Sequence, residues 1–600
     1  MTTTVVELED ILNEEVKKAM QSLYQFDCPT IAWQKTRKEF KGDLTMVVFP
    51  FLKITKKGPE QSAEEIGAYL KAHADVVQDY NVVKGFLNLE VDHSYWLSFF
   101  NELHSNKDYG VNWADENSDQ VMVEYSSPNT NKPLHLGHIR NNLLGYSVAQ
   151  ILNANDQKPV KVQIVNDRGI HICKSMLAWQ KFGNGSTPES EGIKSDHFVG
   201  KYYVAFEKNY RAQVNELIEQ GWTKEEAEKS APLMEEAKEM LRKWEANDEE
   251  VISLWKTMNN WCYEGFDQTY KALGVDFDKL YFESNTYLLG KDLVLKGVED
   301  GVFYQKEDGS VWVDLTDEGL DHKLLLRADG TSVYMTQDIG TAIERFKEYN
   351  IKSLIYTVAD EQDYHFKVLF LILKKLGYDW WKGLFHLSYG MVDLPTGKMK
   401  SREGTVVDAD DLVAEMIATA KAKCEERGVG DDLDESELSE IHRKVGLAAL
   451  KYYILKVDPK KRMTFNPEES IDFNGNTGPL VQYTYVRTRS LLRKADSLGV
   501  DMNQAMIEGN DLQDKEIELL KLIRDFKAVV KEAGEKFNPS LIANYAYDLA
   551  KEYNSYYAAQ PILKEENEAL KVFRIQLSNA VGNTIKNAMI LLGIEMPERM

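Results

Sequence analysis

The chain has 600 residues, with 96 acidic and 72 basic side chains and a formal net charge of −24 at pH 7. This length predicts about three or four domains, and the acidity argues against nonspecific nucleic-acid binding while leaving room for a specific RNA partner. The four cysteines are scattered without a C-x-x-C pair, so no structural zinc is expected. Free thiols, an N-terminus unlike a signal peptide and no long apolar run predict a cytoplasmic protein without membrane association.

An N-terminal α+β domain is predicted over residues 1–117. Hydrophobic spacing predicts a helix over 5–23 and strands over 44–54 and 82–91. Between the two strands, a capping-box pattern that begins at Ser62 predicts the start of another helix.

Residues 118–407 are predicted to form a catalytic domain around a doubly wound parallel sheet. The stretch 121–125 reads as a buried strand, helical spacing follows from Ile139 onward, and 160–164 reads as a second buried strand. Strand, loop, helix and strand make the βαβ unit of Rossmann-like folds, whose ligands bind at the carboxyl ends of the strands. The loop 128–138 is expected at that place.

The loop ends in the motif His135-Leu-Gly137-His138 at the predicted start of the helix. Helix N-termini favour anions because their first N–H groups are unpaired, and two imidazoles there can donate to phosphate oxygens. Gly137 allows a flat base or a phosphate to approach the backbone, and Lys132 adds positive charge. A capping loop with incidental histidines is the alternative, and the βαβ context favours nucleotide binding.

A helical insertion is predicted at about 185–280, where the chain is charged and follows helical spacing. In 324–342 the pattern predicts a turn at Asp329-Gly330, then a strand and a helix, and 353–373 repeats the strand-to-helix pattern. A further strand over 385–394 completes the predicted doubly wound sheet.

The segment 397–404 is flanked by glycines and carries three cations. Such a loop suits a polyphosphate, because glycines permit movement and the cations neutralise developing charge. An exposed basic turn is the alternative for so short a motif, but its pairing with the histidine motif favours the functional interpretation. Beyond it, residues 408–600 follow helical spacing almost throughout and predict an all-α bundle domain.

The histidine motif resembles a signature of class I aminoacyl-tRNA synthetases, and nearly the whole chain resembles the arginyl-tRNA synthetases among them. The matching strings are EYSSPNTNKPLHLGH, SVYMTQD, EQDYHF, GKMKSREGTVV, SIDFNGNTGPLVQYTYVRTRS, YAYDLAKEYNSYY and LLGIEMPERM. The histidine motif by itself indicates only the class, whereas the extended loop, the SIDFNGNTGP segment and the terminal string are specific to the arginine family.

The resemblance implies a catalytic centre for ATP accompanied by Mg²⁺, with no metal held by the protein. The residues implied in catalysis are His135, His138, Lys132, Lys398, Lys400, Ser401 and Arg402. Those implied in ATP binding are Leu134, His135, Gly137, His138 and Met399. Where the usual second signature has its second lysine this chain has Ser401, and either Lys132 or Lys400 is expected to replace it.

The resemblance also implies an arginine pocket. Its residues would be Glu124, Asn129, Tyr334, Asp338 and Gln362. A guanidinium group presents a planar fork of donors that matches carboxylates. Glu124 and Asp338 would therefore bind the guanidinium and the α-ammonium, in an order that the sequence leaves open. Lysine lacks the fork, so the pocket would discriminate against it.

The implied reaction activates L-arginine with ATP and transfers it to the terminal adenosine of tRNA(Arg). In this family activation generally requires bound tRNA, and a monomer is expected. The N-terminal domain would contact the tRNA, and the helical domain would read the anticodon. Candidate contacts are Tyr483, Arg487, Arg489 and Tyr545, although core packing explains the tyrosines equally well.

Three rival interpretations are weaker. A synthetase for another amino acid would need features that this chain lacks, such as zinc ligands or a large editing insertion. A noncatalytic tRNA-binding relative would tend to lose the two catalytic loops. A small nucleotidyltransferase would not need the long helical domain.

Overall fold

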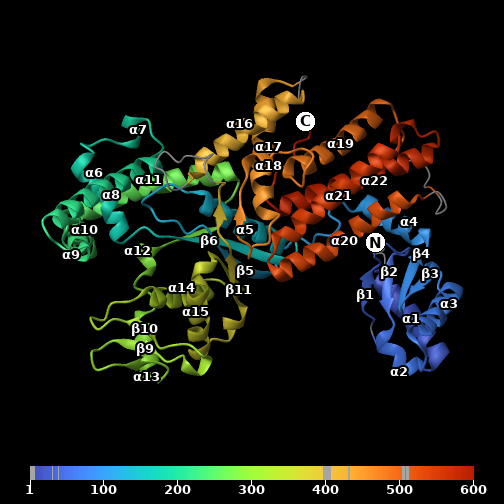
Figure 1. Ribbon diagram of the computed structural model, residues 1–600, viewed down its shortest axis with the longest axis horizontal. Helices are drawn as coiled ribbons and strands as arrows, with labels where there is room; N and C mark the ends of the chain where they lie inside the picture. Colours follow the sequence, from blue (N-terminus) through green and yellow to red (C-terminus); the bar gives the residue numbers. More distant parts are fainter. Residues whose placement is uncertain are drawn as a thin grey trace. The chain divides into compact units, whose positions relative to one another are not determined.

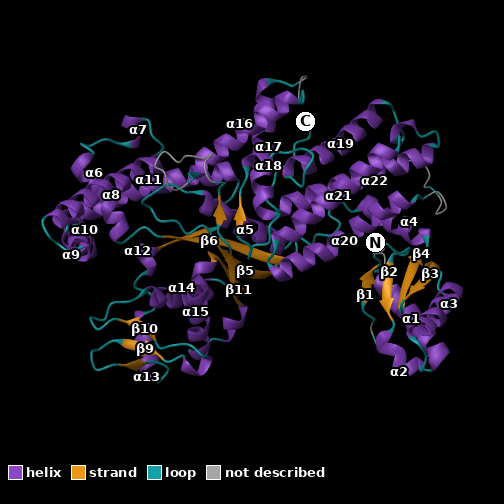
Figure 2. Cartoon of the chain, viewed as in Figure 1, coloured by secondary structure: helices purple, strands orange, loops and turns teal. Residues whose placement is uncertain are grey.

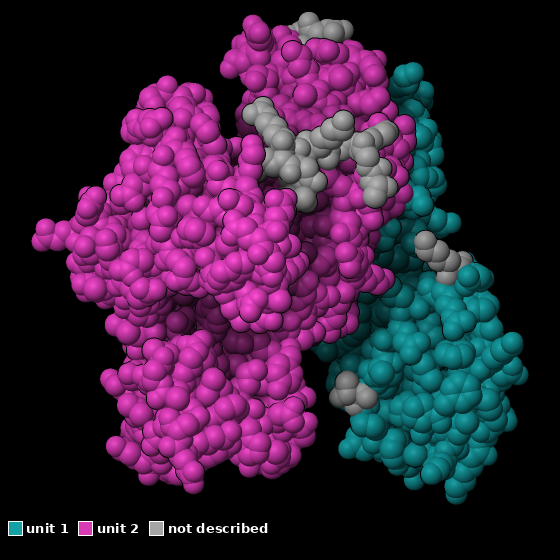
Figure 3. Space-filling view, turned by 60° about the vertical axis from the view of Figure 1, so that its left-hand side comes forward, with its two compact units in different colours: residues 1–110, 487–527, 548–585 teal, residues 111–486, 528–547, 586–600 magenta. Residues whose placement is uncertain are grey.

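The computed structural model describes residues 7–29, 31–37, 39–395, 407–429, 433–502, 507 and 512–600. The chain forms two compact units, which Figure 3 colours separately. The first contains 1–110, 487–527 and 548–585, and the second contains 111–486, 528–547 and 586–600.

The first unit contains a four-stranded antiparallel sheet in the order β1-β2-β4-β3. Helix α1 buries Leu8, Leu12 and Val16, which recur at helical spacing and face its core. The elements up to residue 105 are α1 (Leu8–Tyr24), β1 (Trp33–Lys35), β2 (Leu44–Val47), η1 (Phe49–Phe51), α2 (Leu52–Thr55), α3 (Pro59–His73), β3 (Val77–Val83), β4 (Phe86–Val91) and α4 (His93–Ser105).

Two predicted strands of this unit are confirmed only in part. The strand predicted over 44–54 ends at Val47, because Pro50 lacks the N–H that a sheet needs and lies in the short 3-10 helix η1. The strand predicted over 82–91 is a hairpin instead. Lys84 and Gly85 form its turn with φ angles of 51° and 82°, the positive values that a tight two-residue turn requires.

The predicted capping box at Ser62 is wrong. Helix α3 begins at Pro59, whose fixed φ suits the first helical turn. The hydroxyl of Ser62 is buried inside the helix and lies 2.8 Å from the hydroxyl of Thr55.

The second unit is organised around a five-stranded parallel sheet in the order β12-β11-β5-β6-β7, drawn in orange in Figure 2. The strand order reverses between β5 and β11, and this switch point is where doubly wound folds bind ligands. The predicted fold class is therefore confirmed. The elements of the sheet region are β5 (Asp119–Glu124), α5 (Leu136–Asn153), β6 (Gln157–Val165), α6 (Ile170–Phe182), β7 (Lys279–Phe282), α12 (Glu283–Thr286), α14 (Tyr334–Glu348), β11 (Ile351–Ala359), η3 (Asp360–Gln362), α15 (Asp363–Lys375), η4 (Asp379–Gly383), β12 (Leu384–Tyr389) and β13 (Val392–Asp393).

Alternate residues of β5 enter two different cores. Val121 and Val123 pack on the side of α5, whereas Met122 packs with residues of α14 and α15. Gly145 brings α5 close to the sheet, because a Cβ atom there would lie 2.3 Å from Cβ of Tyr125. The helix that begins with the histidine motif is thus seated firmly against the central strand.

The helical insertion consists of α7 to α11, shown in green in Figure 1. Thr223 caps one of its helices as a capping box. Between 283 and 334 a small antiparallel sheet, β10-β9-β8, precedes the predicted turn at Asp329-Gly330. No strand of the described chain separates that turn from α14, which begins at Tyr334, so this part of the prediction is wrong. The bounds are α7 (Pro188–Glu191), α8 (Ser195–Glu219), α9 (Lys224–Ser230), α10 (Pro232–Glu245), α11 (Glu249–Leu273), α13 (Lys291–Glu299), β8 (Tyr304–Gln305), β9 (Val311–Val313), η2 (Thr316–Glu318) and β10 (Lys323–Leu326).

The remaining chain is almost entirely helical, as predicted. Its elements are α16 (Ala409–Glu426), α17 (Glu435–Leu455), β14 (Met463–Thr464), α18 (Pro467–Ser470), α19 (Gly478–Ser497), α20 (Asp514–Lys536), α21 (Pro539–Ala559), η6 (Ile562–Lys564) and α22 (Glu568–Leu591). Helices α19 to α22 each contribute residues to both units. Among the described residues, none of the helices is long and apolar enough to cross a membrane.

Candidate active site

The loop that follows β5 adopts an unusual backbone conformation. Ser126 and Ser127 have φ angles of 71° and 50°, in the left-handed region that L residues rarely adopt. The N–H of Ser126 donates to the side-chain oxygen of Asn141 on α5, whose amide donates in turn to the carbonyl of Thr357 on β11 at 2.8 Å. Asn141 therefore ties the loop, the helix and both strands of the switch point together.

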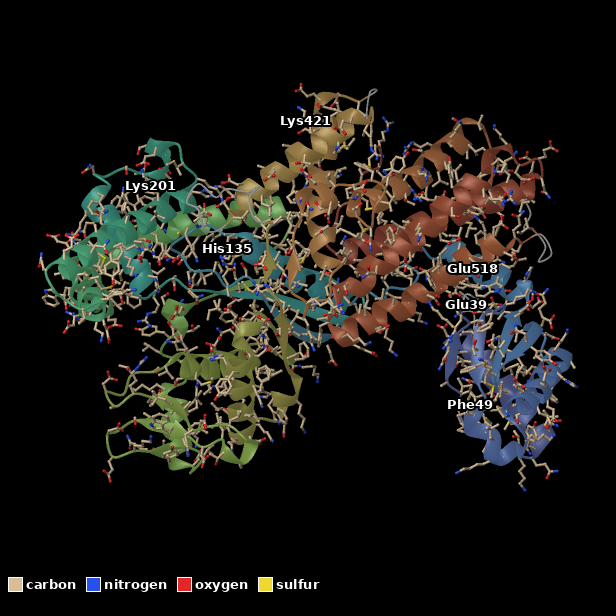
Figure 4. The ribbon with its side chains drawn as sticks, in the orientation of Figure 1. Glu39, Phe49, His135, Lys201, Lys421 and Glu518 are labelled. Atoms are coloured by element: carbon tan, nitrogen blue, oxygen red, sulfur yellow. The ribbon has the colours of Figure 1, made fainter. Side chains whose placement is uncertain are left out.

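The side chains of His135 and His138 form a capping box at the start of α5, in which each imidazole accepts from a backbone N–H. Figure 4 labels His135. Nδ1 of His135 accepts from the N–H of Gly137 at 3.1 Å, and Nδ1 of His138 accepts from the N–H of His135 at 3.2 Å. Because each Nδ1 is an acceptor, the proton of each neutral ring lies on Nε2. Both Nε2–H groups are thus donors suited to phosphate oxygens.

Both imidazoles are held in the neutral form. Burial, with the charge of Lys132, lowers the pKa of His135 to about 4. Burial, His135 and Lys132 together lower the pKa of His138 well below its ordinary value. Lys132 itself is half-buried, its pKa is lowered by burial, and no carboxylate in the described chain pairs with it. Its charge is therefore available to a ligand beside the histidines.

The residues that follow the second signature loop are hydrogen-bonded to the chain at the histidine motif. The N–H of Leu136 donates to the carbonyl of Val407 at 3.0 Å, and the N–H of Ala409 donates to the carbonyl of Leu134 at 3.0 Å. Five predicted site residues of that loop, Lys398, Met399, Lys400, Ser401 and Arg402, lie outside the described residues.

A cavity of about 1100 Å³ opens at the carboxyl ends of the central strands. Four predicted arginine-pocket residues line it: Asn129 from the loop after β5, Tyr334 and Asp338 from α14, and Gln362 from η3. Tyr334 is 75% exposed at the cavity wall. Asp338 accepts a hydrogen bond from Nε2 of His365 at 2.6 Å, which orients its carboxylate.

Glu124, the fifth predicted pocket residue, does not line this cavity. Strand alternation turns its side chain to the same face as Met122, where it forms an ion pair with Arg345 of α14. Glu124 and Arg345 are 7% and 1% exposed, so the carboxylate is buried and already neutralised. This geometry does not support the expectation that Glu124 binds arginine, because its carboxylate lies outside the cavity lining and pairs with Arg345.

Glu283 supplies a further carboxylate in the cavity, and the sequence did not predict it. Burial raises its pKa to about 7; the charge of Arg168 opposes this shift, and those of Asp167 and Asp338 add to it. Its position directly after β7, at the carboxyl end of a parallel strand, is the signal that could have identified it.

One cluster of possible metal ligands lies near α16, formed by Asp196, His197 and Asp410. The ammonium of Lys194 is 3.2 Å from the carboxylate of Asp196 and 2.6 Å from that of Asp410. The ammonium of Lys194 thus already offsets part of the negative charge of this cluster.

Known proteins resemble this chain over nearly its whole length. A family model described as tRNA synthetases class I (R), catalytic domain, matches residues 100–466. The arginine–tRNA ligase of Bacteroides fragilis is 61% identical over 597 residues, which cover 99% of this chain and 100% of that protein. The chain belongs to the arginine–tRNA ligase family. Members of this family are ligases, so the chain is an enzyme of the class I aminoacyl-tRNA synthetases.

Further comparisons extend the family likeness to both ends of the chain. The Arginyl tRNA synthetase N terminal domain model matches residues 7–91, and the DALR anticodon binding domain model matches 481–600. The arginine–tRNA ligase of Porphyromonas gingivalis is 57% identical, covering 98% of this chain and 99% of that protein. A solved structure of Thermus thermophilus arginyl-tRNA synthetase shares the fold, with a TM-score of 0.79 at 24% identity over 99% of this chain and 100% of that one.

The predicted tRNA contacts of this arginine–tRNA ligase family member have different surroundings. Tyr483 is 37% exposed, whereas Tyr545 is 7% exposed and packs in the helical core. Arg487 donates to the side chain of Asn554, and Arg489 donates to the side chain of Asn579 at 2.8 Å. Burial favours the packing explanation for Tyr545, and RNA contact stays a prediction for the others.

Proposed function

We propose that the cavity binds L-arginine while the histidine motif binds ATP, so that arginine is activated and then joined to tRNA(Arg), the reaction of this family. The observation that carries the proposal is that Glu283 and Asp338 line one cavity. Of the two other carboxylates there, Glu245 pairs with Arg168 and Asp329 accepts hydrogen bonds from Thr331. The loop after β5 connects that cavity, through Asn129, to Lys132 and the two histidines.

The polarity of the site gives the direction in which arginine lies. The α-carboxylate of arginine must reach the α-phosphate of ATP. The end of the substrate that carries this carboxylate therefore lies near Asn129 and the histidine motif. The guanidinium then extends toward Glu283 and Asp338, whose acceptors match its planar fork of donors. The amide of Gln362 and the exposed Tyr334 complete the polar wall around the substrate.

In the first step, an oxygen of the arginine carboxylate attacks the α-phosphate in line, and the bond to pyrophosphate breaks. Nε2–H of His135 and of His138 donate to phosphate oxygens, and Lys132 neutralises charge that develops there. In the second step, a hydroxyl of the terminal adenosine attacks the arginyl carbonyl and AMP leaves.

The remaining parts of the proposal rest on the family likeness. The N-terminal domain, 1–117, contacts the tRNA, and the helical domain, 408–600, binds the anticodon, in line with the two domain models that match there. Arginine activation requires bound tRNA, the enzyme acts as a monomer in the cytoplasm, and Mg²⁺ accompanies ATP.

Arginylation of tRNA(Arg) by the wild-type enzyme and by D338N tests the proposal. The wild type should charge the tRNA with arginine and not with lysine. Loss of a hydrogen bond to a charged group, about 2 kcal/mol, should raise the KM for arginine about 30-fold in D338N. The KM for ATP should stay unchanged. An unchanged KM for arginine in D338N would show that this cavity is not the arginine site.

A further inference from the structure

The segment Asn166-Asp167-Arg168 follows β6 and has no role in the proposed chemistry so far. Asp167 is 1% exposed, yet its carboxylate has three donors around it. One oxygen accepts from the N–H of Ser284 at 2.8 Å. The other accepts from the hydroxyl of Ser284 at 2.7 Å and from that of Tyr263 at 3.2 Å.

This arrangement favours a carboxylate. Three groups donate to its two oxygens, and a carboxylate accepts all three hydrogen bonds with the strength of a charged acceptor. The buried charge is tolerated because it is fully hydrogen-bonded. An asparagine would fill the same space, but its N–H₂ group would have to donate to the two hydroxyls, and neutral hydrogen bonds would replace the charge-assisted ones.

Asp167 is itself held rigidly by the helical insertion. Its backbone carbonyl accepts from the indole N–H of Trp255 at 2.6 Å and from the side-chain amide of Asn259 at 3.1 Å, both on α11. A hydrogen bond to Ser284 from such a fixed point restrains the start of α12, which follows β7 directly. Glu283 is the first residue of α12 and immediately precedes Ser284.

The neighbouring Asn166 restrains another residue of the cavity lining, Asn129. Its N–H donates to the carbonyl of Pro128 at 2.9 Å, and its carbonyl accepts from the N–H of Thr130 at 3.2 Å. These two bonds enclose Asn129. One short segment after β6 therefore restrains both Asn129 and Glu283, which face the same substrate.

We infer that Asp167 is a positioning residue for arginine recognition, which aims the carboxylate of Glu283 at the guanidinium by fixing Ser284. This inference rests on the proposed function, because it takes Glu283 to be a ligand of arginine. Asp167 touches no substrate atom. It keeps the carboxylate of Glu283 in the position that binds the guanidinium, and small displacements of such a group weaken substrate binding.

The test is steady-state arginylation by the full chain at pH 8, where Glu283 is largely ionised, with D167N, S284A, E283Q and the control D196N. D167N should raise the KM for arginine about tenfold, and S284A, which removes one donor, about threefold. The KM for ATP should change less than about twofold in both. D196N removes a buried carboxylate outside the cavity, so it should leave the KM for arginine unchanged.

The outcomes separate the inference from the proposed function. An unchanged KM for arginine in D167N, together with a raised KM in E283Q, would overturn the positioning role and leave the arginine site standing. Unchanged KM values in both would remove the arginine site itself. If D167N does not fold, as judged by its thermal melt, S284A decides: an unchanged KM for arginine in S284A overturns the inference.

Discussion

Glu283 should make arginine binding depend on pH near neutrality. Burial is the main reason why its pKa rises from the ordinary 4.5 to about 7. The charge of Arg168 opposes this rise, and the charges of Asp167 and Asp338 add to it. Only the ionised carboxylate pairs with a guanidinium. With this pKa, roughly nine-tenths of Glu283 is ionised at pH 8 and roughly one-tenth at pH 6, so the KM for arginine should rise about tenfold between them.

The assay is arginylation at saturating ATP and tRNA(Arg), with the KM for arginine measured at pH 6, 7 and 8. E283Q stays neutral at every pH, so its KM should be about 30-fold above that of the wild type at pH 8 and should not vary with pH. D338N keeps a titrating Glu283, so its KM for arginine should still rise as the pH falls. Because the charge of Asp338 helps to raise the pKa of Glu283, this rise should move to lower pH in D338N. A flat wild-type profile, or a tenfold slope that persists in E283Q, would refute this reasoning.

Three further predictions concern the rest of the site. K132A should lower arginylation by on the order of a hundredfold with an unchanged unfolding transition, since it removes the charge beside the histidines; near-normal activity would move this role to Lys400. E124Q should cost about 3 to 5 kcal/mol of stability by leaving buried Arg345 unpaired, with no change in the KM for arginine; normal stability with a raised KM would contradict the structural role of Glu124. Nitrogen NMR of the selectively labelled protein at pH 7 should show His135 and His138 as neutral rings protonated at Nε2; a titration of either near pH 6.5 would contradict the capping geometry.

The central architecture could be predicted because it depends on local patterns. A short strand, a helix with an apolar stripe and a second strand specify a βαβ unit, and parallel topology then places the loops at one edge. For this reason Asn129, Tyr334, Asp338 and Gln362, which are far apart in the chain, line one cavity as the family likeness implied.

The two acidic residues could not be distinguished from sequence. Glu124 follows an apolar strand and matches a family string, but its side chain faces Arg345, a partner that only the packing of α14 on the sheet reveals. Glu283 lies in a stretch without a recognised string, and its place in the cavity depends on Ser284 and on Asp167, more than a hundred residues earlier. Contacts between residues so far apart in the chain produce no periodic pattern in the sequence.

The errors in local structure have short-range causes. Pro50 and the turn at Lys84-Gly85 interrupt apolar stretches whose alternation continues past the break. Hydrophobic spacing alone therefore does not separate the two elements on either side. The missed start of α14 arises because apolar residues around Tyr334 suit a strand and a helix equally well. Packing on β10 and β11 decides for the helix.

Arginine-dependent exchange between ATP and pyrophosphate, with and without tRNA(Arg) and with lysine and glutamine as controls, tests the central claim most directly. The account predicts exchange with arginine only when tRNA is present, and none with lysine or glutamine. Exchange with arginine in the absence of tRNA would keep the activation chemistry and remove the tRNA requirement. No exchange with arginine from the folded enzyme under either condition would contradict the account.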